Sequence, residues 1–187
     1  MSKIRFTEPN REILARRDSI INDLTRLVDP AGLITSTDEC RAYETDALTA
    51  YRKMPLAVVL PKTTEEVSAV LKYCHDTGVK VVPRGAGTSL AGGAIPSEDA
   101  VVLGLSKMNR VLAVNYDDRF IRVEAGVTNL SVTAVVAENG FFYAPDPSSQ
   151  LACTIGGNIA NNSGGAHCLK YGVTTNNLLG LRMLLID

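Results

Sequence analysis

The chain has few residues of the types that build metal centres. Its 187 residues include four cysteines, Cys40, Cys74, Cys153 and Cys168, and two histidines. No two cysteines form a C-x-x-C pair, and no Cys/His spacing suits zinc or an iron–sulfur cluster. We therefore expect no metal site, and we expect the cysteines to be reduced thiols, as in a reducing compartment.

Long apolar runs and an excess of charge of one sign are also missing. No stretch approaches the roughly 20 apolar residues of a transmembrane helix. The basic residues near the N-terminus precede no apolar h-region, so we expect no secretory signal, and the acidic residues among them argue against a transit peptide. With 19 basic and 20 acidic residues the net charge is -1. This balance argues against nucleic-acid binding. Because the sequence shows no targeting signal and no membrane span, the default expectation for the location is the cytoplasm.

The chain does contain the alternating elements of a mixed α/β domain, with 45% apolar residues. The run 56–60 reads as a buried strand, Thr63 and Glu66 form a capping-box pattern, and the following helix ends at Gly78. Residues 79–83 form the next strand, so 56–83 is a βαβ unit. Further elements are expected as follows: a helix over 13–28, a strand over 100–105, a hairpin of 111–115 and 120–124, a helix over 128–139 and a strand over 181–186.

The predicted strand 181–186 ends the chain at Asp187 without a turn or a pairing partner. A hairpin partner would be expected next, so we expect the chain to be a truncated fragment.

Two glycine-rich runs, 84–93 and 156–165, carry the functional prediction. Glycine lets backbone N–H groups approach a ligand with no Cβ in the way, and successive N–H groups in a concavity bind anions. The Rossmann pattern G-x-G-x-x-G fails in the first run at Leu90. The P-loop pattern fails because Gly93-Ala94 stands where Lys and Ser/Thr are required. A flexible connector for the first run, and a tight helix start for the second, remain the structural alternatives.

Several segments resemble a known family. Residues 83–93 are similar to the pyrophosphate loop of the FAD-binding domains of vanillyl-alcohol oxidase and p-cresol methylhydroxylase. Residues 143–150, 153–158 and 167–172 resemble the FAD-linked subunits of bacterial glycolate oxidases. The likeness extends from about Ser36 to Asp187. It implies a two-subdomain FAD-binding domain over 51–187, incomplete and without its substrate domain, after an N-terminal helical or irregular segment over 1–50.

The resemblance also implies a set of cofactor-binding residues. The FAD pyrophosphate would be held by Arg84, Gly85, Ala86, Gly87, Thr88, Ser89, Gly92 and Gly93. The flavin and its ribityl chain would be lined by Pro145, Asp146, Thr154, Gly157, Asn158, Ser163, Gly164 and Gly165. No catalytic residue can be transferred to this chain.

The implied activity is oxidation of a 2-hydroxy acid, of glycolate or D-lactate type, to the 2-oxo acid by hydride transfer to flavin. The implied partner is an iron–sulfur electron-transfer subunit, through which the protein would be peripheral to the inner membrane. One alternative is an FAD-binding fragment without turnover. Another is a flavin-dependent reductase on the same fold.

Two polar residues near the second run keep more than one interpretation. His167 follows the pair Gly164-Gly165, and its possible chemical roles are a base or a covalent attachment point for flavin. Because the sequence offers it no evident partner carboxylate, a structural role is preferred. Asp146, between two prolines, contacts the cofactor or caps a turn.

Overall fold

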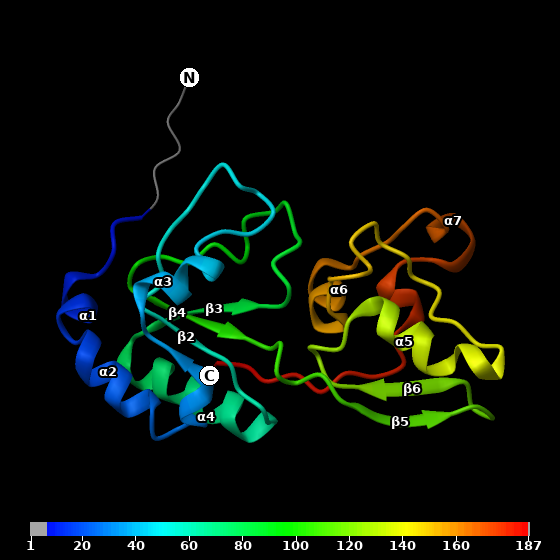
Figure 1. Cartoon of the computed structure of the whole chain (residues 1–187), viewed down its shortest axis with the longest axis horizontal. Coiled ribbons are helices and arrows are strands. Elements are labelled where there is room, and N and C mark those ends of the chain that lie inside the picture. The colour runs from blue at the N-terminus through cyan, green and yellow to red at the C-terminus, as the bar shows by residue number, and fades with distance from the viewer. Residues whose placement is uncertain (1–6, 187) are drawn as a thin grey trace. The chain divides into compact units, whose positions relative to one another are not determined.

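The structure is a computed structural model, and it describes residues 7–186. The described chain forms two compact units, which Figure 1 shows. The first unit holds the described residues up to Pro83, then Leu90–Leu103, Leu185 and Ile186, and the second holds Arg84–Ser89 and Gly104–Leu184. The mixed α+β class and the two-subdomain organisation are thereby confirmed. The boundary after residue 50 stays a prediction.

A four-stranded sheet organises the first unit. Its strands are β1 (Leu33–Ile34), β2 (Ala57–Val59), β3 (Lys80–Arg84) and β4 (Ala100–Gly104), in the order β1-β2-β4-β3. β1 is antiparallel to β2, and β2 is parallel to β4. The predicted βαβ unit is present, but β4 lies between its two strands. The short strand β1 has no counterpart in the sequence prediction.

Both faces of this sheet are covered, which explains why β2 and β4 are apolar along their whole length. Val58 and Val102 pack in one cluster with Leu60 and with Cys40 at the end of α3 (Thr37–Cys40). Since successive side chains of a strand point to opposite faces, the alternate residues of β2 and β4 turn toward the other face. Figure 1 shows α4 lying along the underside of this sheet.

Helix α4 (Thr64–Thr77) has the ends that its sequence predicts. The hydroxyl of Thr63 accepts from the Glu66 amide at 3.1 Å, and Gly78 closes the helix in the left-handed region with φ 73°. The Glu66 carboxylate accepts from the Lys62 amide at 2.6 Å instead of completing the capping box on Thr63.

The predicted single helix over 13–28 is wrong. The structure has two helices, α1 (Arg11–Ala15) and α2 (Arg17–Leu24). The break comes at Arg16, whose amide donates to the Ile13 carbonyl at 3.1 Å. This bond reaches three residues back, as in a 3₁₀ helix, instead of the four residues of an α-helix. Helix α2 joins α4 through the Tyr73 hydroxyl, which donates to Asp23 at 3.0 Å.

A buried carboxylate fixes the start of β4. Asp99 is fully buried and pairs with Lys80 of β3 at 2.8 Å, while the Asn10 amide donates to it at 2.8 Å. Burial raises the pKa of Asp99, but the hydrogen bonds from Lys80, Ser97 and Asn10 together lower it to about 2. Asp99 therefore stays ionised and ties the N-terminal segment to the sheet.

The second unit contains a hairpin, three α-helices and two short 3₁₀ helices, Ala137–Asn139 and Thr174–Asn177. β5 (Val111–Asn115) and β6 (Phe120–Val123) are antiparallel, as predicted. The helices are α5 (Asn129–Val136), α6 (Ile155–Asn161) and α7 (Cys168–Tyr171). The predicted helix over 128–139 is confirmed, with its last turn in 3₁₀ form and Gly140 in the left-handed region.

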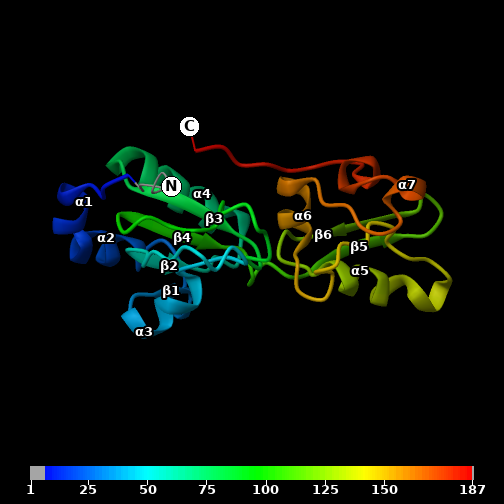
Figure 2. The same cartoon turned by 90° about the horizontal axis from the view of Figure 1, so that it is seen from above.

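The predicted strand over 181–186 is wrong. Residues 178–186 run as an extended segment outside any helix or strand, drawn in red in Figure 2. A strand requires a hydrogen-bonded neighbour, and no strand of the described residues pairs with this segment. Leu181, Met183 and Leu185 are all more than half exposed as a result.

The cysteine side chains are free thiols, with Cys40, Cys74 and Cys153 buried and Cys168 half-buried. Across residues 7–186, His, Cys, Asp and Glu side chains form no cluster of three or more that would suit a metal ion. None of the helices in that range combines the length and apolar character needed to cross a bilayer.

Candidate functional site

The first glycine-rich run is an open loop directly after β3. Gly87 has φ 71°, a left-handed conformation that favours glycine. A Cβ on Gly87 would lie 2.2 Å from the Arg84 guanidinium, so the Arg84 side chain folds back across the loop. Among the described residues, the amides from Gly85 to Thr88 donate no hydrogen bond. The loop therefore presents consecutive unpaired N–H groups, which is the arrangement of an anion-binding nest.

The second run begins helix α6, as its structural alternative anticipated. Thr154 is the N-cap, and its hydroxyl accepts from the Gly157 amide at 3.3 Å. The amides of Ile155 and Gly156 donate to the carbonyls of Val127 and Ala125, each at 2.9 Å. These first-turn donors are already used within the protein, so α6 does not offer them to a ligand.

The two runs meet within the second unit. A Cβ on Gly85 would lie 2.5 Å from the Thr154 hydroxyl oxygen and 3.7 Å from the Gly157 Cα. The Ser89 hydroxyl lies 3.4 Å from the Asn161 side-chain oxygen. Glycine at position 85 is therefore what lets the first loop lie against the start of α6. Loop and helix form one candidate site. Ser89 and Asn161, which contact each other there, are 72 residues apart in the sequence.

Two predicted residues of the first run belong to the other unit. Gly92 and Gly93 lie in the stretch Leu90–Leu103 of the first unit. Gly92 has φ 75°, and a Cβ there would lie 3.5 Å from the Leu48 side chain. The second-unit site thus contains Arg84 to Ser89 without this glycine pair.

A buried amide network supports the segment that carries Pro145. Asn158 and Asn129 are each 1% exposed, and the Asn158 side-chain amide donates to the Asn129 oxygen at 2.9 Å. The Asn129 amide donates in turn to the Pro145 carbonyl at 3.0 Å. Asn158 therefore acts through Asn129 on the position of Pro145. Asn129 is not recognisable from the sequence, since nothing in its local pattern marks it.

The end of the second run packs closely against Asp146. A Cβ on Gly165 would lie 2.0 Å from the Asp146 carbonyl oxygen, and one on Gly164 would lie 2.9 Å from the Val173 side chain. The Ser163 carbonyl accepts from the Thr174 amide at 2.9 Å and from its hydroxyl at 2.7 Å. These contacts require glycine at both positions and hold residues 163–165 in place.

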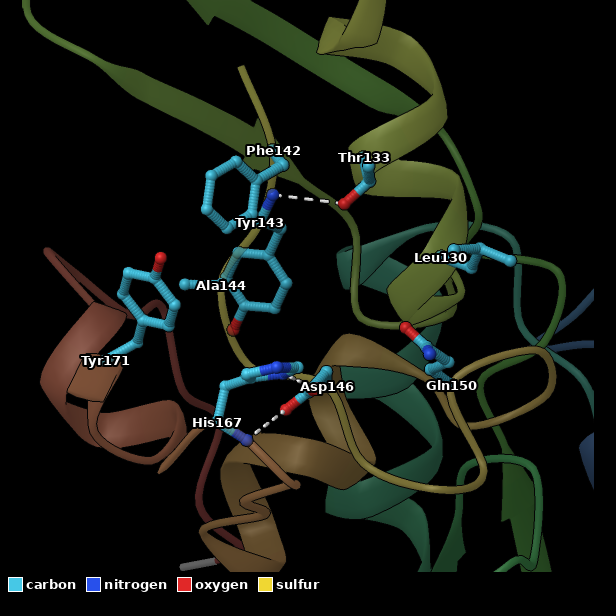
Figure 3. A pocket seen from close by; sticks show the side chains of 9 residues that line it. All are labelled: Leu130, Thr133, Phe142, Tyr143, Ala144, Asp146, Gln150, His167 and Tyr171. Atoms are coloured by element: carbon cyan, nitrogen blue, oxygen red, sulfur yellow. Dashed lines mark hydrogen bonds and ion pairs between the residues drawn. The ribbon is translucent and has the colours of Figure 1, made fainter. Parts of the chain in front are cut away.

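This packing gives His167 a partner carboxylate that is not evident from the sequence. The Nδ1 atom of His167 lies 2.6 Å from Asp146 Oδ2, and the His167 amide donates to Asp146 Oδ1 at 3.3 Å. The two dashed lines of Figure 3 between these residues mark this pair. The hydrogen bond from His167 holds the pKa of Asp146 below its ordinary value, so the carboxylate is ionised at neutral pH. The expectation that His167 lacks a partner is wrong.

An open pocket of about 370 Å³ lies beside this pair in the second unit. Figure 3 shows its lining residues, which come from α5, the segment 142–150, His167 and α7. They are Leu130, Thr133, Phe142, Tyr143, Ala144, Asp146, Gln150, His167 and Tyr171. The walls are largely aromatic and aliphatic, with a few polar groups, which is typical of small-molecule sites.

The donor set of the first loop fits a diphosphate. The unpaired amides from Gly85 to Thr88 suit phosphate oxygens, and the Thr88 hydroxyl adds a donor. The Arg84 guanidinium supplies positive charge. The residues present in the second unit are therefore compatible with the dinucleotide that the resemblance implies.

Curated relatives agree with that resemblance. The chain is 47% identical over 171 residues to glycolate oxidase subunit GlcD of Escherichia coli (strain K12), covering 91% of this chain and 34% of that protein. It is 38% identical to D-lactate dehydrogenase of Archaeoglobus fulgidus, covering 90% and 37% respectively. It is 34% identical to mitochondrial D-2-hydroxyglutarate dehydrogenase of Bos taurus, covering 89% and 31%. The chain thus spans about a third of the length of these relatives.

Solved structures confirm the fold. Alkyldihydroxyacetonephosphate synthase superposes with a TM-score of 0.77 at 22% identity, over 91% of this chain and 33% of that one. p-Cresol methylhydroxylase with bound substrate gives 0.68 at 20% identity, over 83% and 30%. Residues 55–187 match the family described as FAD binding domain, which confirms FAD as the expected cofactor. The chain therefore belongs to the FAD binding domain family.

Proposed function

We propose that this chain is the FAD-binding portion of an oxidoreductase that converts a 2-hydroxy acid to the 2-oxo acid. The observation that carries the proposal is the contact of Gly85 with Thr154 and of Ser89 with Asn161, which joins the two glycine-rich runs. The names of the relatives, which include a glycolate oxidase subunit and D-lactate and D-2-hydroxyglutarate dehydrogenases, support the substrate class.

FAD, when bound, would supply the hydride acceptor, and the residues of this chain would bind and orient it. The amides from Gly85 to Thr88 and the Arg84 guanidinium hold the diphosphate. Pro145, Asp146, Thr154, Gly157, Ser163, Gly164 and Gly165 line the flavin and ribityl side, and Asn158 positions Pro145. Gly92 and Gly93 remain assigned to the pyrophosphate on the resemblance alone.

The electron acceptor that we assign is an iron–sulfur partner subunit. The Escherichia coli relative is named as a subunit, which supports assembly with other chains. We also propose that the protein is cytoplasmic and that this partner holds it at the inner membrane as a peripheral protein.

The test is FAD uptake by the purified protein, followed by visible absorbance, and then anaerobic dye reduction with glycolate or D-lactate. Gly85→Ala adds a Cβ 2.5 Å from the Thr154 oxygen and pushes the loop from α6. Overpacking of this kind costs about 1–3 kcal/mol, which corresponds to roughly a 5-fold to 150-fold weaker FAD affinity.

Gly180→Ala is the matched control, because a Cβ there meets nothing within 4 Å. Uptake of FAD without dye reduction would favour the alternative, an FAD-binding fragment that does not turn over substrate. A protein that takes up no FAD, or a Gly85→Ala variant that binds as tightly as the control, contradicts the proposal.

A further inference from the structure

One carboxylate of the first unit has an oxygen atom without a hydrogen-bond partner. Asp46 is 4% exposed, and its Oδ1 atom accepts from the Leu48 amide at 2.8 Å. Its Oδ2 atom is fully buried and has no partner among the described residues. Glu44, two residues earlier, is by contrast paired with Arg52 at 3.1 Å. A buried polar atom that stays unpaired costs free energy, so the position of Asp46 needs a physical reason.

Neither solvent nor a ligand reaches this oxygen directly. Because Oδ2 is fully buried, an atom the size of a water molecule touches it only after the residues that cover it have moved. A hydrogen-bond donor for Oδ2 must therefore come from the protein segments packed around the turn 46–48.

The loop that packs on this turn has donors to offer. The turn and the stretch Leu90–Leu103 both belong to the first unit, and a Cβ on Gly92 would lie 3.5 Å from the Leu48 side chain. Figure 1 draws the two segments as the cyan and green loops above the sheet. Among the described residues, the amides of Gly92, Gly93 and Ala94 donate no hydrogen bond. An acceptor without a donor thus lies on the turn that contacts three donors without acceptors.

Gly93 is a glycine that the packing of the described residues does not require. Its φ lies outside the left-handed region, unlike that of Gly92 at 75°, and a Cβ on Gly93 would meet nothing within 4 Å. The missing Cβ leaves this peptide open to close approach by another group. A carboxylate suits the position, because an anion accepts from successive backbone N–H groups.

We propose that Asp46 is a positioning residue for nucleotide binding, whose free oxygen accepts from the Gly92–Ala94 amides when the loop 84–93 holds the FAD diphosphate. The inference rests on the proposed function. β3 anchors the start of this loop, and a turn in which the Ile95 amide donates to the Gly92 carbonyl at 3.2 Å anchors its end. Fixing the second end reduces the conformational entropy that the loop loses when FAD binds.

Asp46→Asn separates this role from a structural one. The variant keeps an oxygen for the Leu48 amide but places an N–H donor where the Gly92–Ala94 amides need an acceptor. We expect FAD to bind at least about 10-fold more weakly, because a hydrogen bond to a charged group is lost. Without FAD, the urea midpoint should be no lower than that of the wild type, since a neutral amide replaces an unpaired buried carboxylate. Asp38→Asn, at a side chain that is 94% exposed on α3 of the same unit, is the matched control and should change neither quantity.

Amide hydrogen exchange shows which group the turn serves. In the wild type we expect FAD to slow exchange at Gly92, Gly93 and Ala94 as well as at the amides from Gly85 to Thr88. In Asp46→Asn at saturating FAD, only the amides from Gly85 to Thr88 should slow. If the Gly92–Ala94 amides slow equally in the variant, the nucleotide itself binds them and the inference is overturned.

A double-mutant cycle with Gly93→Ala completes the test. If Asp46 acts through this turn, the two substitutions together weaken FAD binding less than the sum of their separate effects, and additive effects overturn the inference. An Asp46→Asn variant that binds FAD as tightly as the wild type, or that is less stable without FAD, also overturns it while the proposed function stands. If the wild-type protein takes up no FAD, the proposed function fails, and the inference, which requires the bound nucleotide, fails with it.

Discussion

The buried amides of Asn129 and Asn158 allow a sharp test of how the candidate site is held. Asn129→Ala leaves two partners unpaired, the Pro145 carbonyl and the Asn158 side-chain amide, which now contact it at 3.0 and 2.9 Å. Each unsatisfied buried group costs about 1–3 kcal/mol, so we expect about 2–6 kcal/mol less stability. That is a large share of the roughly 5–15 kcal/mol of a typical domain.

Asn129→Asp sharpens the test because it changes hardly any volume. The new carboxyl still accepts from Asn158, but when ionised it places a charge against the Pro145 carbonyl at a position that is 1% exposed. Its pKa in the folded protein should therefore be raised. The variant should approach wild-type stability at acidic pH, where the carboxyl is protonated, and lose stability as the pH rises above about 4, the unfolded pKa.

The assay is urea unfolding followed by circular dichroism at several pH values. Asn139→Ala is the control, since its amide donates to the Tyr116 hydroxyl at 2.8 Å at the surface. A surface change of this kind should stay within about 0.5 kcal/mol. A loss below about 1 kcal/mol for Asn129→Ala, or a pH-independent Asn129→Asp, would refute the claim that these bonds are dry and structural.

Three further outcomes follow from single contacts. Gly165→Ala puts a Cβ 2.0 Å from the Asp146 carbonyl oxygen, so urea unfolding should show a loss of about 1–3 kcal/mol, whereas a variant no less stable than wild type would refute the close approach. Asp99, with a pKa of about 2 against an ordinary 3.8, contributes about 2 kcal/mol that is present above pH 4 and lost as the pH falls toward 2. Acid titration of Asp99→Asn should lack this loss, and an unchanged profile would contradict it. Cys168, the half-buried thiol, should react with a disulfide reagent in the native protein well before the three buried thiols do, and equal rates would contradict that order.

Local signals predicted the elements that are set by local physics. The run 56–60, the cap at Thr63 and the stop at Gly78 each act within a few residues, and the structure has β2 and α4 where they indicate. The strand predicted over 181–186 had the right composition but depended on a neighbour elsewhere in the chain. An apolar run indicates that a segment can form a strand, but the strand forms only where a neighbouring strand pairs with it.

The candidate site, like the fold, could be predicted only where its signals are local in the sequence. The glycine runs were visible because each is continuous in sequence, and their meeting through Gly85 and Ser89 follows from the fold. The pairing of Asp146 with His167 spans 21 residues and depends on the missing Cβ of Gly165. No pattern of residue types encodes such a contact, which is why the two side chains were considered separately in the sequence.

The position of β4 in the middle of the first sheet has a consequence for synthesis. β2 and β3 leave the ribosome before β4, yet the strand order gives them no bonds to each other. Until residues 100–104 emerge, both strands keep open edges that could associate with other nascent chains. β4 is therefore the last strand to complete this sheet, and Val58, which packs in one cluster with Val102 of β4, stays partly uncovered until then.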